Sequence, residues 1–314
     1  MKLKSQLKLI IKIFISGVLL YFIVKDVNFD EIFASFKTSN KLLLILAFSL
    51  HAVGLTISAI RWKVLLTAQG VQSKIGFLIK SYMVATFFNH FMPSTVGGDS
   101  VRAYDSWRLG ENKAKAFAVV VVDRFMGLLT LLVFVIIATF FTEKITSQIP
   151  NLNAWLILLV IGALSIVWFI LFPPLSLFEK LSDNNNSIVK KIGGLLHKLG
   201  SAFAQFSTKK EALVKAIFLS VLLQANVVFY YFLISQALNF NIDIINFFLI
   251  VPLTIFIMMI PISINGIGLR ENTLFFFLSF YGVAKSQAIT FAWLEYGMLL
   301  ILGIIGGIVY ALRK

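Results

Sequence analysis

The sequence predicts an all-α polytopic membrane protein with about eight transmembrane helices and two re-entrant or broken segments, near residues 75–98 and 255–282. Hydrophobic residues make up 59% of the chain, charged residues make up only 13%, and the mean hydropathy is +0.92. Soluble domains carry about 25% charged residues. Long uncharged stretches and two similar interruptions by proline and glycine support the same fold class.

Apolar stretches of sufficient length define the expected crossings, because a helix needs about 20 residues to span a bilayer. Three of them contain no charged residue and no histidine: 154–172, 216–238 and 244–269. Five less purely apolar stretches are also expected to cross: 13–24, 42–60, 117–141, 272–284 and 288–312. Residues 75–92 are apolar but stop at the first interruption, so we interpret them as re-entrant.

The distribution of positive charge predicts the orientation, because Lys and Arg collect in short cytoplasmic loops. With the N-terminus inside, the cytoplasmic segments hold most of the 28 lysines and arginines. The outside loops hold only Lys25, Lys37, Lys41, Lys144 and Lys285. We therefore expect one integral domain over residues 1–314, in the cell membrane, with both termini cytoplasmic and the first apolar segment retained as a helix.

Residues 174–212 are expected to form a cytoplasmic loop that contains an amphipathic helix. Apolar residues recur at helical spacing between Ile188 and Phe206, while Lys190, Lys191 and Lys198 occupy other faces. This pattern is typical of a helix in the membrane interface. The alternative is a cytosolic helix packed on the protein's own loops. The net charge of +14 indicates anionic lipid headgroups as partners, and no nucleic-acid motif is present.

One short pattern occurs twice, as PSTVGGDSVR at 93–102 and as PISINGIGLRE at 261–271. In each copy an apolar segment stops at proline, passes through small residues and glycines, and restarts with an arginine near a carboxylate. Such breaks free backbone polar groups, which lipid tolerates only where they face protein, water or ligand. Discontinuous segments at matching places in two halves indicate a transport site and an internal repeat.

Ionisable residues within membrane segments are costly, so each is a candidate for function. With the glycines of the two breaks they form the predicted substrate-binding set: Gly97, Gly98, Asp99, Arg102, Asp123, Arg124, Gly266, Gly268, Arg270, Glu271 and Glu295. Free N–H groups at a helix start and a guanidinium fork suit a phosphate. We hypothesise that the arginines contact a lipid phosphate and that the carboxylates balance them or bind a cationic headgroup. The alternative is that these charges are internal salt bridges between broken helices.

Other features restrict the function. His51 and His90 are expected to be interhelical hydrogen-bond partners, and Gly303, Gly306 and Gly307 indicate close helix packing. The sequence contains no cysteine, no nucleotide-binding phosphate loop and no zinc motif. We therefore expect no metal, no cofactor and no catalytic residue, and we do not expect an enzyme.

Three stretches carry a family resemblance: 93–102, the DRFMGL block at 123–128, and 261–271. They resemble the signature regions of the flippase-like transmembrane domain of lysylphosphatidylglycerol synthases, which also occurs alone in YbhN-like membrane proteins. The resemblance covers nearly the whole chain, although Asn265 stands where the family usually has a glycine. It implies lipid handling without the cytosolic synthase domain that bifunctional members carry.

The leading hypothesis is a lipid flippase or translocator for a phosphate-bearing headgroup of an anionic, aminoacylated or polyprenyl lipid. Movement would be passive or ion-coupled, with Glu295 as the candidate proton carrier. One alternative is a membrane-embedded transferase acting on a phospholipid or polyprenyl phosphate, with Asp99 or Asp123 as the base. Another is a non-catalytic partner of a separate lipid-modifying enzyme, and a homo-oligomer is a further option.

The positive-charge pattern places Arg102 and Arg270 on the cytoplasmic side, which argues against a strictly inverted repeat. We therefore expect the two breaks to form two walls of one cytoplasm-facing cavity.

Overall fold

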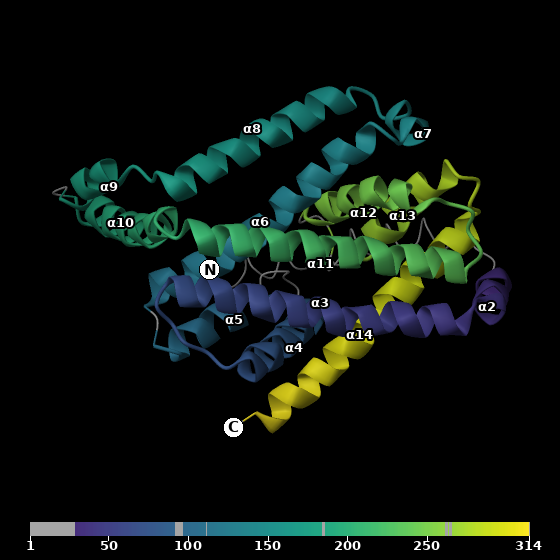
Figure 1. The fold of residues 1–314 in the computed structure, drawn as a ribbon, viewed down its shortest axis with the longest axis horizontal. Helices are drawn as coiled ribbons and strands as arrows, with labels where there is room; N and C mark the ends of the chain where they lie inside the picture. Colours follow the sequence, from purple (N-terminus) through teal and green to yellow (C-terminus); the bar gives the residue numbers. More distant parts are fainter. Residues whose placement is uncertain are drawn as a thin grey trace.

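The computed structural model describes residues 29–91, 97–110, 112–183, 186–260, 263 and 266–313. All regular secondary structure in these ranges is helical, which confirms the predicted all-α class (Figure 1). The first expected crossing, 13–24, lies outside the described residues.

Five helices of the described chain are long and apolar enough to cross a membrane, which confirms a polytopic protein. They are α3 (Lys41–Ala68), α6 (Lys113–Thr139), α8 (Leu152–Leu171), α11 (Lys210–Ala237) and α14 (Lys285–Leu312). Helix α3 has 28 residues and is therefore about 42 Å long. Because it continues to Ala68, Arg61 and Lys63 belong to a transmembrane helix and not to a loop.

Asparagine side chains cap the N-terminal ends of three helices, α3, α6 and α10 (Ser187–Ser207). The side chain of Asn40 accepts a hydrogen bond from the backbone N–H of Leu42 at 3.0 Å, and Asn112 accepts one from Lys115 at 2.8 Å. Asn186 caps α10 in the same way. Such caps satisfy donors that the first helical turn leaves without partners.

The first re-entrant segment is a helical hairpin. Helix α4 (Ile75–Phe91) leads to the first break, and α5 (Gly97–Arg108) returns from it and packs against α4. The expected break near 75–98 is therefore confirmed.

The second break also lies at the turn of a hairpin, and this corrects two expected crossings. Residues 244–269 and 272–284 do not each span. Helix α12 (Ile244–Met258) has 15 residues, and α13 (Leu269–Ser279) has 11. Both are shorter than the roughly 20 residues that a crossing needs. Gly266 and Gly268 have φ angles of 77° and 78°, which an α-helix cannot contain. The crossing 244–269 was expected because the segment carries no charge, and the lack of charge does not indicate where the backbone turns.

The two hairpins enter the bundle from opposite ends (Figure 1). One end carries α9 (Leu175–Ser182), α10 and the C-terminal end of α14, and we call it the basic end. The α4–α5 hairpin starts there. The opposite end carries α2 (Phe29–Thr38) and α7 (Glu143–Thr146), and the α12–α13 hairpin starts from it. The hairpins therefore have inverted orientations, because 244–269 turns back before it completes the crossing that the sequence suggested.

Each hairpin packs on its own hydrophobic core. One core surrounds α12 and α13 and includes Phe247, Leu274 and Phe291. The other lies among α3, α4 and α6 and includes Trp62 and Leu78. The polar side chains described below are thus held by two separate apolar scaffolds.

Helix α10 is partly packed on the protein. Phe203 and Phe206 are buried, whereas Ile188, Ile192 and Leu195 are exposed. Its N-terminal half therefore presents an apolar face that no described residue covers. Its placement in the membrane interface stays a prediction.

Glycine brings α14 against α4. A Cβ atom at Gly306 would lie 1.9 Å from the backbone oxygen of Met83, and one at Gly307 would lie 2.9 Å from the ring of Phe87. The prediction of close helix packing at these glycines is confirmed.

We expect Gly306→Ala to destabilise the protein by about 1–3 kcal/mol, because the added methyl group forces the two helices apart. Thermal unfolding of the purified protein in detergent measures this change. Gly297→Ala is the matched control on the same helix, because a Cβ there meets nothing within 4 Å. Equal melting temperatures for the two variants would contradict the close contact.

Candidate functional site

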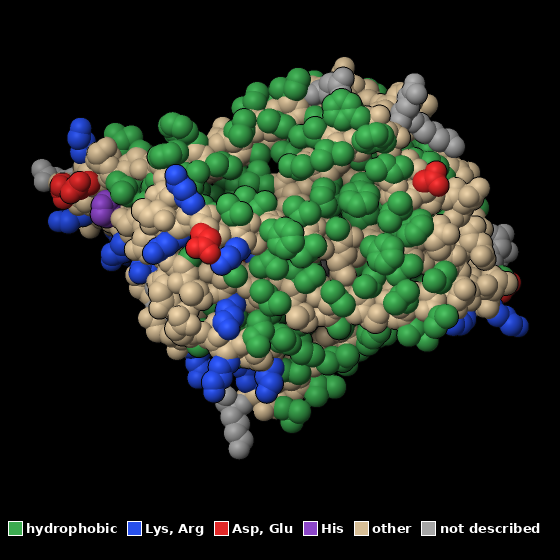
Figure 2. Space-filling view, viewed as in Figure 1, with side chains coloured by type: hydrophobic (Ala, Val, Ile, Leu, Met, Phe, Trp, Pro, Cys, Tyr) green, Lys and Arg blue, Asp and Glu red, His purple; other side chains and the backbone are tan. Residues whose placement is uncertain are grey.

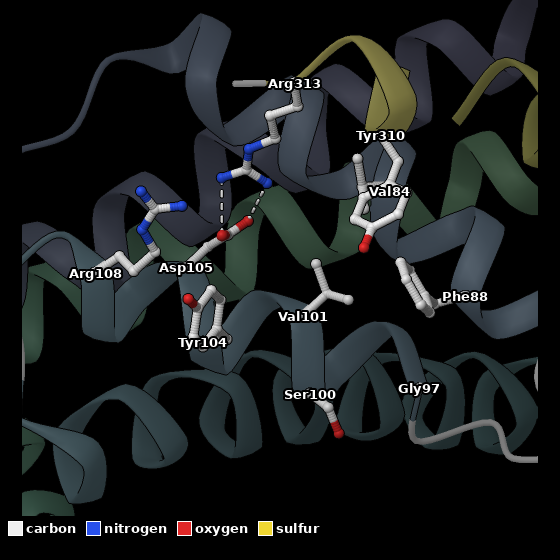
Figure 3. Close-up of a pocket in the computed structure, with 10 residues that line it drawn as sticks. All are labelled: Val84, Phe88, Gly97, Ser100, Val101, Tyr104, Asp105, Arg108, Tyr310 and Arg313. Carbon is white, nitrogen blue, oxygen red and sulfur yellow. Dashed lines mark hydrogen bonds and ion pairs between the residues drawn. The ribbon is translucent and has the colours of Figure 1, made fainter. Parts of the chain in front are cut away.

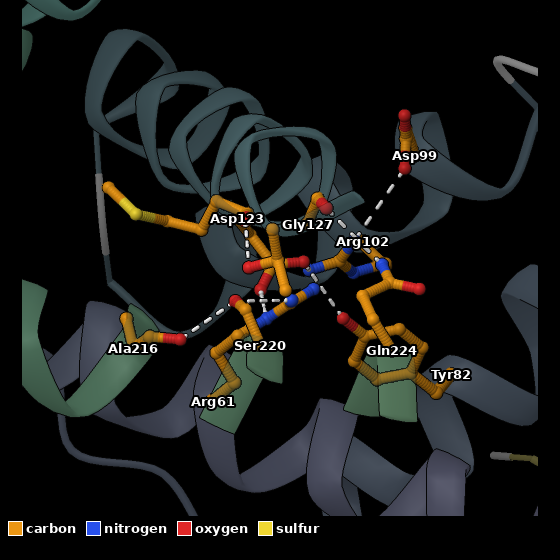
Figure 4. A network of polar contacts seen from close by, with 11 residues as sticks. Arg61, Tyr82, Asp99, Arg102, Asp123, Gly127, Ala216, Ser220 and Gln224 are labelled. Atoms are coloured by element: carbon orange, nitrogen blue, oxygen red, sulfur yellow. Dashed lines mark hydrogen bonds and ion pairs between the residues drawn. The ribbon is translucent and has the colours of Figure 1, made fainter. Parts of the chain in front are cut away.

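Asp123 on α6 is the centre of a buried charge network (Figure 4). Its Oδ1 accepts a hydrogen bond from Arg61 Nε at 2.6 Å, and its Oδ2 accepts one from Arg102 Nη2 at 2.7 Å. The hydroxyl of Tyr82 donates to the same Oδ2 at 3.0 Å. The Asp123 side chain is only 1% exposed. Four helices, α3, α4, α5 and α6, therefore meet on one carboxylate.

The network continues through Asp99 at the start of α5. Arg102 Nη1 lies 3.6 Å from Asp99 Oδ1, and Arg124 Nε forms an ion pair with Asp99 Oδ2. The Arg102 guanidinium lies over the rings of Trp62 and Tyr82, at 4.9 and 4.3 Å from their centroids. We call the charged and phenolic members the Asp123 network: Arg61, Tyr82, Asp99, Arg102, Asp123 and Arg124.

A cavity of about 190 Å³ lies at this network. All six members of the network line it, together with Asn89 and Thr86 of α4. The lining includes three arginines and two aspartates and so has one excess positive charge. The Arg124 side chain is 42% exposed, which makes it the most accessible of the three cations. Such a cavity suits an anion that enters past Arg124.

Gly98 allows α5 to approach α4 at this cavity. A Cβ atom at Gly98 would lie 2.4 Å from the backbone oxygen of Ala85 and 2.6 Å from Asn89 Oδ1. The Gly98 N–H donates to Asn89 Oδ1 at 2.8 Å. Gly98 therefore serves helix packing, and its N–H is already used inside the hairpin. Gly97 lines a different pocket.

The second break carries a separate buried network. Arg270 Nη1 lies 3.4 Å from Glu295 Oε2, and both side chains are at least 95% buried. Arg270 also lies 4.5 Å from the ring centroid of Tyr296, and Tyr231 interacts electrostatically with Glu295. These four residues form the Arg270 network. Glu295, which has no basic neighbour in sequence, thus finds its partner on another helix.

Glu271 caps its own helix. Its Oε2 accepts a hydrogen bond from the Gly268 N–H at 2.7 Å. The positive φ angles of Gly266 and Gly268 shape the turn before α13. These three residues hold the second break in shape, and they do not line the cavity of the Asp123 network.

His90 connects the tip of the first hairpin, through Tyr296 of α14, to the Arg270 network. Its ring, at the end of α4, lies 6.1 Å from that of Tyr296, which in turn lies under Arg270. His90 was expected to be a hydrogen-bond partner, but neither ring nitrogen has one among the described residues. His51 packs against the ring of Tyr230 at 4.3 Å, and its Nε2 also has no such partner. Among the described residues, both histidines therefore make ring contacts.

The structure divides the predicted set of site residues. Asp99, Arg102, Asp123 and Arg124 share one cavity, whereas the residues of the second break lie outside it. The expectation that both breaks line one cavity is therefore wrong, because the hairpins enter from opposite ends.

Sequence reasoning missed Arg61, Tyr82 and Asn89 as members of the site. The one available signal was that the apolar run 42–60 continues as a helix into Arg61. A tyrosine and an asparagine inside an apolar helix gave no comparable signal.

Comparison with known proteins shows the family of the chain. Residues 9–307 match the lysylphosphatidylglycerol synthase TM region. The chain belongs to that family. It is also 20% identical over 278 residues to the UPF0104 membrane protein PH1989 of Pyrococcus horikoshii, across 80% of this chain and 81% of that protein. The predicted family resemblance is confirmed, and the chain is a multi-pass membrane protein of this family.

We expect Asp123→Asn to destabilise the protein by about 3–5 kcal/mol, because two buried guanidinium groups lose their carboxylate. Unfolding in detergent, followed by circular dichroism, measures the loss. The matched control is Glu211→Gln, which removes the carboxylate of an exposed ion pair with Lys215 and should leave stability unchanged. Equal stability of both variants would show that the Asp123 network does not hold the four helices together.

Proposed function

We propose that this protein is a lipid translocator that binds the phosphate of a lipid headgroup in the cavity of the Asp123 network. The observation that carries this proposal is the cavity lining, in which three arginines outnumber two aspartates inside a membrane bundle. Guanidinium forks bind phosphate oxygens in pairs. The acyl chains would stay in the bilayer while the headgroup occupies the cavity.

The opposed hairpins support movement of the headgroup across the bundle. Transporters commonly build their sites from discontinuous segments in inverted repeats, near the middle of the membrane. Here the tip of one hairpin leads through His90 and Tyr296 to Arg270 on the other. In this proposal the phosphate binds first in the cavity of the Asp123 network. It then binds at the Arg270 network.

The charge distribution supports an orientation. Figure 2 shows that Lys and Arg side chains gather on the side where α10 and the C-terminal end of α14 lie. We therefore propose that the basic end faces the cytoplasm of a cell-membrane protein. The Asp123 network, which lies at the hairpin that starts from this end, would take up the lipid from the cytoplasmic leaflet.

The substrate class follows from the shared phosphate group. Anionic phospholipids, aminoacylated phospholipids and polyprenyl phosphates all present it on a hydrophobic chain. Asp99 lines the cavity and pairs with Arg124, so it is the carboxylate placed to contact a cationic aminoacyl group.

The two networks bear on the other hypotheses. Both oxygens of Asp123 accept hydrogen bonds from three donors, so this carboxylate is poorly suited to act as the base of a transferase. Glu295 is paired with Arg270, and its role as a proton carrier stays a prediction.

We expect Arg124→Gln to slow transbilayer movement of a fluorescent anionic phospholipid by roughly 10- to 100-fold. The reason is the loss of one charge-assisted hydrogen bond of about 1.5–3 kcal/mol. Reconstituted vesicles, with dithionite quenching of the outer-leaflet fluorophore, measure the rate. Lys191→Gln on the exposed part of α10 is the matched control and should leave the rate unchanged.

Two outcomes would count against the proposal. Wild-type protein that accelerates no anionic, aminoacylated or polyprenyl lipid would refute translocation. Loss of cellular function on charge reversal at Lys190, Lys191 and Lys198, with Arg124→Gln fully functional, would favour the role of a partner for a lipid-modifying enzyme.

A further inference from the structure

A second pocket, of about 470 Å³, lies on the other face of α5 (Figure 3). Val101, Asp105 and Arg108 face this pocket, whereas Arg102 faces the Asp123 network. One helix therefore separates two cavities. The volume lies within the roughly 300–1,000 Å³ typical of small-molecule sites.

The pocket has an apolar end and a charged end. Val84 and Phe88 of α4, Val101 of α5 and the ring of Tyr310 of α14 form the apolar end, which Figure 3 shows on one side of the pocket. The rings of Phe88 and Tyr310 are in edge contact at 5.2 Å between centroids. This separation of apolar and charged groups suits a ligand with a hydrocarbon chain and a polar head.

The charged end is built around Asp105. Arg313 donates two hydrogen bonds to its carboxylate, both at 2.8 Å, and Ser81 donates a third at 2.5 Å. Arg108 extends toward the same end (Figure 3). It lies 6.0 Å from the ring of Tyr104 and forms no ion pair within the described ranges. Arg313 is paired with Asp105, so the charged end has two arginines and one carboxylate and keeps one excess positive charge for an anionic head.

Tyr104 lines the pocket, and the residues next to it have the composition of a membrane interface. Tyr104 is 52% exposed and Trp107 is 42% exposed, and their rings lie in edge contact at 5.7 Å. Lys113 lies over the Trp107 ring at 4.7 Å. Tyrosine, tryptophan and basic residues gather where lipid headgroups begin.

We propose that this pocket binds an anionic phospholipid, with one acyl chain between α4, α5 and α14 and the phosphate on Arg108 and Arg313. The site is separate from the cavity of the Asp123 network and does not depend on the proposed translocation. A lipid bound here touches the same helix that carries Arg102 on its other face.

Photo-crosslinking in lipid vesicles tests the site. The full chain is reconstituted in phosphatidylcholine with a trace of photoreactive phosphatidylglycerol or photoreactive phosphatidylcholine, both carrying the diazirine on the same acyl chain. Peptide mass spectrometry locates the labels. We expect phosphatidylglycerol to label α4, α5 and α14 at the pocket at least fivefold more than phosphatidylcholine does.

Two variants sharpen the test. Arg108→Gln should reduce phosphatidylglycerol labelling at the pocket to the level of phosphatidylcholine. Val101→Trp should block the apolar end and remove labelling there. Val133→Trp is its matched control, because Val133 is 49% exposed and lies outside the pocket. Size-exclusion profiles and melting temperatures confirm that the variants are folded.

Equal labelling by the two lipids, or unchanged labelling of Val101→Trp, would overturn the proposal. If Val101→Trp fails to fold, Arg108→Gln decides alone, because its exposed side chain is not needed for packing. Labelling requires no lipid movement, so a chain that labels as expected but moves no lipid would refute the translocator proposal and leave this site standing.

Discussion

The burial of Asp123 between Arg61 and Arg102 is the interaction on which the first half of the structure depends. A charge in a membrane bundle is tolerated only when it is paired and hydrogen-bonded. Asp123 meets that requirement with donors from three different helices, α3, α4 and α5. The need to satisfy one carboxylate therefore fixes the position of the first hairpin and gathers the arginines that line its cavity.

The second half of the structure also buries charged side chains, and it pairs them through different residues. Arg270 and Glu295 pair with each other, and Tyr231 and Tyr296 surround them. Glu271 satisfies the start of α13 from within the hairpin. Each hairpin thus has its own buried ion pair and its own apolar core. The two halves each contain a helical hairpin and a buried ion pair, while the residues that make the polar contacts differ; an internal repeat stays a prediction.

The long helices and the family could be predicted from the sequence, because the length of an apolar stretch and the order of motifs can be read directly along the chain. The sequence also located both breaks, since proline and glycine interrupt helices wherever they occur together. It could not show that 244–269 turns back, because an uncharged segment looks the same whether it crosses or folds on itself. It could not pair Glu295 with Arg270 or Arg61 with Asp123, since those partners come from helices far apart in the chain.

The contact between His90, at the tip of the first hairpin, and Tyr296 of α14 has a consequence for the surrounding bilayer. The two hairpins start from opposite ends of the bundle (Figure 1), and α14 carries Tyr296 beside Arg270 of the second hairpin. Membranes resist a mismatch between their thickness and the apolar length of a protein. A continuous helix responds to such a mismatch by tilting, whereas two hairpins that start from opposite surfaces can also shift relative to each other. We therefore expect bilayer thickness to act on the ring contact that lies between the two buried ion pairs.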